Sequence, residues 1–250
     1  MFRERVRRGA GAGLLVTIGV VVGACTGGSS DVSQPAPSAP AAPAPGKIGA
    51  SEITGPLQGA ALVHALQGGG LLLWMRHTER DDRSGTVTPQ QAASHDCAEQ
   101  SQLTTTGRQH ARQIGTAIRA LHLPIAAVRT ARLCRTEDTG RLLNVAAVTD
   151  DDRLDASSTW VDRGGAAAEQ RATLQVLAEQ SPPGRDLVLI SSALDIPQAQ
   201  PAVLSDLGPG ETAVFRPGPP GSPTLLARIG ESAWPTLLKA ATTTPSTPTR

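Results

Sequence analysis

The stretch LLLWMRHTER, residues 71–80, decides the fold. It follows the glycine run 68–70 and opens with apolar residues, which predict a short buried strand. The strand ends in a polar cluster that begins with Arg76 and His77. Open α/β sheets place ligand sites beyond the carboxyl ends of their strands, so this cluster is a candidate site. Arginine grips phosphate oxygens with a planar fork and neutral imidazole can attack phosphorus, which suits a phosphorylated ligand; a charged surface turn is the alternative.

Helices and strands alternate along the rest of the folded part. Apolar spacing and breakers predict helices over residues 57–66, 104–121, 130–143, 165–180 and 234–240. Short apolar runs predict strands over residues 71–75, 125–128, 187–190, 212–215 and 225–229. An acidic loop is expected at residues 150–152. This alternation indicates an α/β sandwich.

A second candidate for phosphate binding lies in TARLCRTEDTGRLL, residues 130–143, which is predicted to form a turn that enters a helix. Arg132, Arg135 and Thr139 share one face of that helix by spacing. Because helix N-termini attract anions, an arginine in the first turns of this helix suits a phosphate group. A solvated basic face is the alternative.

The polar stretch 81–102 is predicted to be a long loop, and loops of this length are often functional. His95, Asp96 and Cys97 within it could suggest a metal site. Their spacing matches no common zinc pattern, so no metal site is predicted.

The N-terminus has the organisation of an export signal. Arginines at positions 3, 5, 7 and 8 precede the apolar stretch 12–22, and Val-Gly-Ala-Cys follows at residues 22–25. These residues resemble a bacterial lipoprotein signal peptide over residues 1–24, whose removal would leave a lipid on Cys25. The alternative is a membrane-spanning anchor, which needs about 20 apolar residues, more than this stretch has. We therefore expect an exported protein, lipid-anchored to the outer face of the bacterial cell membrane or to the periplasmic side of an envelope membrane.

Composition divides the remainder. Residues 25–53 contain QPAPSAPAAPAP and are predicted to form a flexible Pro/Ala-rich linker with polyproline II character. The folded domain is expected over residues 54–241, with a disordered tail at 242–250. Hydrophobic residues make up 39% of the chain, enough for a core, and aromatics only 2%, so alanine, leucine and valine must do most of the packing. The formal net charge of +1 argues against a nucleic-acid partner.

These motifs resemble the histidine phosphatase superfamily, which has the phosphoglycerate mutase-like fold. LLLWMRHTER resembles its first strand and Arg-His signature, and LTTTGRQHARQIGTAI, residues 103–118, resembles its following helix. TARLCRTEDT, residues 130–139, resembles the segment that the family usually writes Ser-Ser-Pro, two residues, then Arg, although Thr-Ala-Arg replaces Ser-Ser-Pro here. GETAVFRP, residues 210–217, resembles a late strand. The resemblance covers roughly residues 55–238 and implies a three-layer sandwich, with a mostly parallel central sheet flanked by helices.

The resemblance also implies an activity. His77 would be the nucleophile that becomes phosphohistidine, and Arg76 and Arg135 would hold the phosphoryl oxygens. This chemistry is phosphomonoester hydrolysis, with a phosphorylated small molecule or phosphoprotein as substrate and no metal or organic cofactor. Glu79 is a candidate proton donor by its proximity in sequence, and a plain surface glutamate is the alternative.

One departure from the family pattern weakens this prediction. The family places a second histidine just after a later strand, and in DLVLISSALDIP, residues 186–197, that position falls on Ser192. A serine brings no positive charge, and losing one electrostatic donor can cost ~10²–10³ in rate. The sequence therefore predicts either a phosphatase weakened at this position or an inactive pseudophosphatase lipoprotein that binds a phospho-ligand or acts as a scaffold.

The cysteines lead to a further expectation. If Cys25 is lipidated, Cys97 and Cys134 are the two that remain, and an exported chain meets an oxidising setting. A disulfide between them is predicted, worth roughly 4 kcal/mol in the chain-entropy model. Two free buried thiols are the alternative.

Overall fold

The computed structural model describes residues 46–81, 96–192, 201–219 and 222–243. The predicted signal peptide with Cys25, most of the predicted linker, and His95 lie outside these residues. Among the described residues, no helix combines the length and the apolar character that crossing a membrane requires.

One sheet organises the described part of the chain, in the strand order β1-β7-β6-β2-β5-β3-β4. Its strands are β1 Ile53–Thr54, β2 Leu72–Arg76, β3 Ile125–Thr130, β4 Val148–Asp150, β5 Asp186–Ser191, β6 Thr212–Arg216 and β7 Thr224–Ile229. The neighbours β2, β5, β3 and β4 run parallel, whereas β6, β7 and β1 each pair antiparallel with the next strand. The strand that carries the Arg-His pair therefore lies where the parallel part meets the antiparallel part.

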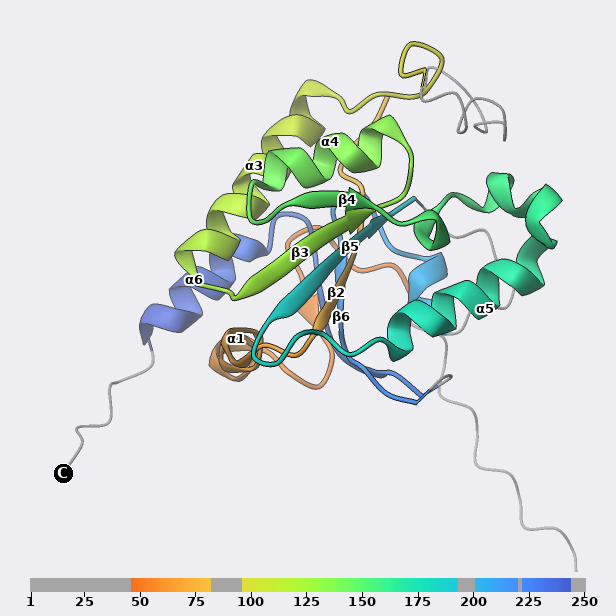
Figure 1. Ribbon diagram of the computed structural model, residues 1–250. Coiled ribbons are helices and arrows are strands. Elements are labelled where there is room, and N and C mark those ends of the chain that lie inside the picture. Colours follow the sequence, from red (N-terminus) through yellow and green to blue (C-terminus); the bar gives the residue numbers. More distant parts are fainter. Residues whose placement is uncertain (1–45, 82–95, 193–200, 220–221, 244–250) are drawn as a thin grey trace, which may run out of the picture. The chain divides into compact units, whose positions relative to one another are not determined.

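Helices cover both faces of this sheet (Figure 1). On one face pack α1 Gly59–Gly68, α3 Thr105–Ala120, α4 Cys134–Leu143 and α6 Trp234–Thr243. The other face is covered by α5 Gly165–Ala178 and by two 3₁₀ helices, η1 Asp152–Leu154 and η3 Ala202–Ser205. A further 3₁₀ helix, η2 Ser157–Arg163, leads into α5. The predicted α/β three-layer sandwich is confirmed.

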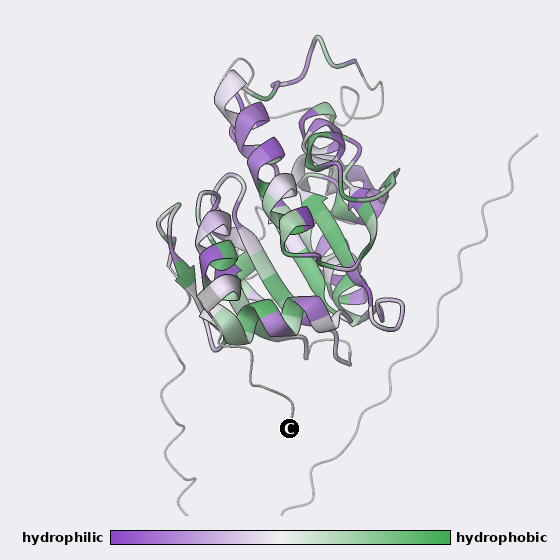
Figure 2. Cartoon of the chain, turned by 90° about the vertical axis from the view of Figure 1, so that its left-hand side faces the viewer, coloured by the Kyte–Doolittle hydropathy of each residue, from purple (hydrophilic) through white to green (hydrophobic). Residues whose placement is uncertain are grey.

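The apolar residues of β2 pack into a hydrophobic core on each face of the sheet. Leu73 and Met75 belong to the core under α1 and α3, whereas Leu72 and Trp74 belong to the core under α5. A strand buried on both faces must be apolar at successive positions, which explains why this run does not alternate. Figure 2 shows hydrophobic residues concentrated in the strands, whereas the helices carry both hydrophobic and hydrophilic residues.

The folded part is longer at both ends than predicted. Ile53, expected in the linker, pairs with Ile229 of β7, and the carbonyl oxygen of Gly46 accepts a hydrogen bond from Arg228. At the other end, α6 continues to Thr243, so the first two residues of the expected tail are helical. Composition alone did not mark these boundaries, because β1 has only two residues and the last residues of α6 are threonines.

The expected acidic loop at residues 150–152 is partly regular structure. Asp150 ends β4, where it pairs with Thr130 of β3, and Asp152 begins η1. This edge strand has three residues and no buried one, so it carries no apolar pattern from which to predict it.

Candidate active site

His77 lies where the chain leaves the central strand. Its backbone N–H donates to the carbonyl of Ser191 at 3.0 Å, and the N–H of Gly210 donates to the carbonyls of both Arg76 and His77. These bonds end β2 at Arg76 and hold the following residue at the carboxyl edge of the sheet. The imidazole is only 1% exposed.

The hydrogen bonds of His77 define which ring nitrogen is free to react. Nδ1 lies 2.7 Å from the carbonyl oxygen of Thr78, which can only accept, so Nδ1 carries the proton. Nε2 is buried and has no hydrogen-bond partner among the described residues. Burial, and next the positive charge of Arg135, hold the pKa of His77 well below its ordinary value. The imidazole is therefore neutral at pH 7, and Nε2 presents a lone pair suited to nucleophilic attack.

Arg135 supplies a buried positive charge that acts on this imidazole. It lies in the first turn of α4, is 5% exposed, and its Nη2 donates to Ser192 Oγ at 3.2 Å. Its Nε and Nη1 find no partner within the described residues. Burial, followed by the charges of Arg80 and Arg76, lowers the pKa of Arg135 to about 10, so it is still charged at neutral pH. Buried donors without a partner are costly, and an anion in this pocket would satisfy them. The alternative, a solvated basic face, does not hold for this residue.

Ser192, the position that the resemblance matches to the family's second histidine, contacts Arg135. It follows β5 directly, and its hydroxyl accepts the hydrogen bond from Arg135. The preceding Ser191 points to the other core, where its Oγ accepts from Trp74 Nε1 at 2.8 Å. The pocket therefore has a neutral hydroxyl where a second imidazole was expected.

Two further arginines act on the same imidazole. Arg76 donates from Nη1 to the carbonyl of Leu207 at 2.9 Å, and its charge lowers the pKa of His77. Arg80, to which sequence reasoning gave no role, lowers the pKa of both His77 and Arg135 by its positive charge. Its Nη1 donates to Ser101 Oγ at 2.7 Å. Arg80 stands in the quoted signature, but in a loop no periodicity tells which charged residues turn inward.

The side chain of Glu79 is hydrogen-bonded to the residue that caps α3. It is exposed, and its Oε1 accepts a 2.6 Å hydrogen bond from the hydroxyl of Thr104, the residue that caps α3. It is not among the groups that shift the pKa of His77. The structure thus gives Glu79 a role in joining the loop after β2 to α3, and its role as proton donor stays a prediction.

The predicted disulfide is confirmed. Cys97 and Cys134 are bonded, with their Cα atoms 5.7 Å apart, and Cys134 is the first residue of α4. Because the sulfur of Cys97 is bonded to another sulfur, it is not a free thiolate for a metal.

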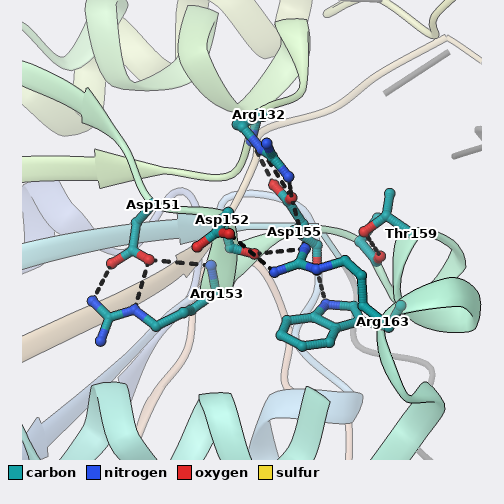
Figure 3. Close-up of polar contacts among 9 residues, drawn as sticks. Arg132, Asp151, Asp152, Arg153, Asp155, Thr159 and Arg163 are labelled. Atoms are coloured by element: carbon teal, nitrogen blue, oxygen red, sulfur yellow. Dashed lines mark hydrogen bonds and ion pairs between the residues drawn. The ribbon is translucent and has the colours of Figure 1, made fainter. Parts of the chain in front are cut away.

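Arg132, which was predicted to share a helix face with Arg135, instead belongs to an ion-pair network (Figure 3). It lies before α4, and its guanidinium donates to Asp155 Oδ2 from both Nε and Nη2. The shared-face prediction is wrong because the helix begins at Cys134, two residues after Arg132.

No protein-family model matches the chain, and no curated protein matches it either. Among solved structures, it is similar to the protein histidine phosphatase SixA complexed with tungstate, at 15% identity and a TM-score of 0.45 over 64% of this chain and 97% of that one. It is also similar to a phosphoserine phosphatase from Entamoeba histolytica, at 15% identity and a TM-score of 0.45 over 65% of this chain and 98% of that one. It is similar as well to a mycobacterial glucosyl-3-phosphoglycerate phosphatase, at 13% identity and a TM-score of 0.42 over 63% of this chain and 97% of that one. The chemistry of the site rests on this chain's own residues.

Proposed function

We propose that this protein is a phosphomonoesterase of the histidine phosphatase type that works through a phosphohistidine at His77. The observation that carries the proposal is the buried, unpartnered Nε2 of a neutral His77 beside Arg135, whose Nε and Nη1 also lack partners among the described residues. A neutral nucleophile next to a cation with donors to spare fits a phosphoryl group, which is electrophilic at phosphorus and anionic at its oxygens.

The reaction has two steps. In the first, Nε2 of His77 attacks phosphorus, an N–P bond forms, and the P–O bond to the leaving group breaks. Arg135 and Arg76 stabilise the charge on the transferring group. In the second, the oxygen of a water molecule attacks phosphorus, the N–P bond breaks, and His77 returns to its neutral form with release of inorganic phosphate. The leaving oxygen takes its proton from Glu79 or from solvent. A Glu79→Gln variant distinguishes the two: if Glu79 is the proton donor, the variant loses more activity with poor leaving groups than with good ones.

The proposed substrate is a phosphorylated small molecule or a phosphoprotein met outside the cytoplasm. The arginine-rich start, the short apolar stretch and the Gly-Ala-Cys sequence support export and a lipid on Cys25. A Cys25→Ser protein should lose the lipid and leave the membrane fraction. Unchanged processing and partitioning into detergent would contradict the anchor.

The activity is tested by assaying an aryl phosphate with wild type, His77→Ala and a control, His64→Ala, whose histidine is exposed on α1. Wild type and His64→Ala should turn over substrate and trap an acid-labile phosphoryl label, and His77→Ala should do neither. If wild type binds inorganic phosphate but gives neither turnover nor label, the non-catalytic alternative is correct. Ser192 is the observation that favours that alternative, because it places a neutral hydroxyl beside Arg135 where the family has an imidazole.

A further inference from the structure

The short segment of Gln100 and Ser101 contacts the structures around His77. Gln100 and Ser101 are both fully buried. Gln100 Oε1 accepts a 3.0 Å hydrogen bond from the backbone N–H of Cys134, the residue before Arg135. Ser101 Oγ accepts the 2.7 Å hydrogen bond from Arg80 Nη1. Two successive side chains therefore contact two structures that surround His77, namely the start of α4 and Arg80.

Bonds at Cys97 and at Gln102 hold this segment on both sides. At one end, the disulfide bonds Cys97 to Cys134. At the other end, the N–H of Asp81 donates to the carbonyl of Gln102 at 2.9 Å, and the N–H of Gln102 donates to Asp81 Oδ1 at 3.1 Å. A covalent link to the first residue of α4 and a pair of hydrogen bonds to the loop after His77 thus hold Gln100 and Ser101 in place.

We propose that Gln100 and Ser101 are positioning residues for phosphate binding, and that the Cys97–Cys134 disulfide holds them there, so that the oxidised protein is the form that binds phosphate tightly. This rests on the proposed function, since it takes the ligand to be a phosphoryl group. The physical reason is entropic. An arginine side chain has about 2 kcal/mol of rotamer entropy to lose when it binds an anion, and a hydrogen bond that already orients Arg80 reduces that loss.

The disulfide is open to exchange from one side. Cys97 is exposed, whereas Cys134 is 5% exposed. A thiolate of an external dithiol attacks the sulfur of Cys97, and Cys134 leaves as a thiolate that takes up a proton. The second thiol of the reagent then displaces Cys97, so two electrons pass to the protein, which gains two thiols, while the reagent becomes a cyclic disulfide. The segment then keeps only its hydrogen bonds.

The positioning role is tested with variants that keep the disulfide. Ser101→Ala should weaken binding of inorganic phosphate, measured by calorimetry, by on the order of tenfold, since it removes a hydrogen bond to a charged group. With an aryl phosphate the loss should appear mainly in KM, and Ser101→Thr, which restores a hydroxyl, should recover part of it. Thr116→Val is the matched control, because Thr116 also accepts from an arginine, Arg119, on α3 away from the pocket.

The redox part is tested on wild type treated with dithiothreitol and then reoxidised. Reduction should weaken phosphate binding several-fold and speed hydrogen exchange at the backbone amide of Cys134, and reoxidation should reverse both. Equal affinity and equal exchange in a reduced, folded protein would overturn the role of the disulfide. If reduction unfolds the protein, the Ser101 variants decide, and unchanged affinity in Ser101→Ala overturns the proposal.

The phosphate-binding measurement separates this inference from the proposed function. If oxidised wild type fails to bind phosphate, the proposed function is wrong, and so is the inference about its ligand. If oxidised wild type binds phosphate but neither reduction nor Ser101→Ala changes the affinity, only the inference is wrong.

Discussion

Two arginine-rich regions differ in how their charges are neutralised. One is the candidate site around His77, with Arg76, Arg80 and Arg135. The other is the ion-pair network drawn in part in Figure 3 and extended by Arg129 and Glu179. In it, four arginines pair with four carboxylates. Its members are Arg129, Arg132, Arg153, Arg163, Asp151, Asp152, Asp155 and Glu179. Among the described residues, no carboxylate pairs with Arg135, whereas each arginine of the network has at least one such partner.

The pKa shifts of the arginines follow this difference. Burial and neighbouring positive charge lower the pKa of Arg135 to about 10. Hydrogen bonds to Asp155 raise the pKa of Arg132, and hydrogen bonds to Asp151 raise that of Arg153. A cation whose neighbours oppose its charge destabilises the fold until an anion arrives, whereas a paired cation has already been neutralised. The same residue type therefore carries an unopposed charge in one region and a paired charge in the other.

The largest expected effect comes from removing one arginine from each region. Arg135→Ala should lower kcat/KM for an aryl phosphate by ~10²–10³, because it removes the buried donor for the transferring group. Its free energy of unfolding should stay the same or rise, since a poorly satisfied buried charge is lost. Arg153→Ala should do the reverse, lowering the free energy of unfolding by about 1–2 kcal/mol with little effect on activity. Steady-state kinetics and urea unfolding measure both, and a loss of stability without loss of activity in Arg135→Ala would break the comparison.

The next effect comes from adding charge to the pocket. Ser192→His should raise turnover by ~10–10²-fold, because it restores a donor where a hydroxyl now contacts Arg135. The gain should fall as pH rises past the imidazole pKa, near ~6.5. The double variant His77→Ala/Ser192→His should be inactive, since a donor without a nucleophile forms no phosphohistidine. A folded Ser192→His protein with unchanged activity would favour the non-catalytic alternative.

A smaller effect is expected from weakening the network at its most buried carboxylate. Asp155 is 2% exposed and accepts from the backbone N–H of Arg132 and from the guanidinium groups of Arg132 and Arg163 (Figure 3). Asp155→Asn keeps acceptors but loses the charge, and should lower the free energy of unfolding by about 1–3 kcal/mol. Asp152→Asn, at a side chain 57% exposed, should cost less than about 0.5 kcal/mol. Equal costs at the two sites would show that burial does not set the strength of the network.

The smallest effect is a pH dependence that belongs to the pocket. The pKa of His77 is lowered in the folded protein, so below about 6.5 the unfolded state binds more protons. Stability due to this group is therefore present above pH 6.5 and is lost as pH falls, with a slope of at most about 1.4 kcal/mol per pH unit. The contribution of His77 is the difference between the free energies of unfolding of wild type and His77→Gln, measured in urea between pH 5 and 8. If this difference stays the same at every pH, the pKa of His77 is not lowered in the folded protein.

Wild type must be compared with His77→Gln because a second buried group, Asp186, changes stability with pH in the opposite direction. Burial raises the pKa of Asp186 to about 7, while its Oδ1 accepts from the N–H of Leu71. Here the folded state binds more protons, so stability falls as pH rises from about 4 towards 7. Asp186 is unchanged in His77→Gln, and its contribution cancels.

Sequence by itself determined the class of fold and the position of the proposed nucleophile. The apolar run before Arg76 predicted β2, and the helix and strand periods predicted every other main element except the short edge strands β1 and β4 and the 3₁₀ helices. These signals are local, since an apolar run or a 3.6-residue period needs no knowledge of distant residues. The family resemblance then singled out His77, Arg135 and Ser192.

Only the tertiary structure decided which charged residues serve the site. Arg80 and Arg132 are both arginines beside a signature, yet Arg80 acts on His77 and Arg132 is neutralised by Asp155. Glu79, two residues from the nucleophile, bonds Thr104 instead, and Ser101, far from it in sequence, holds Arg80. The physical reason is that a charge takes its role from the burial and the partners around it, and these come from segments that only folding brings together.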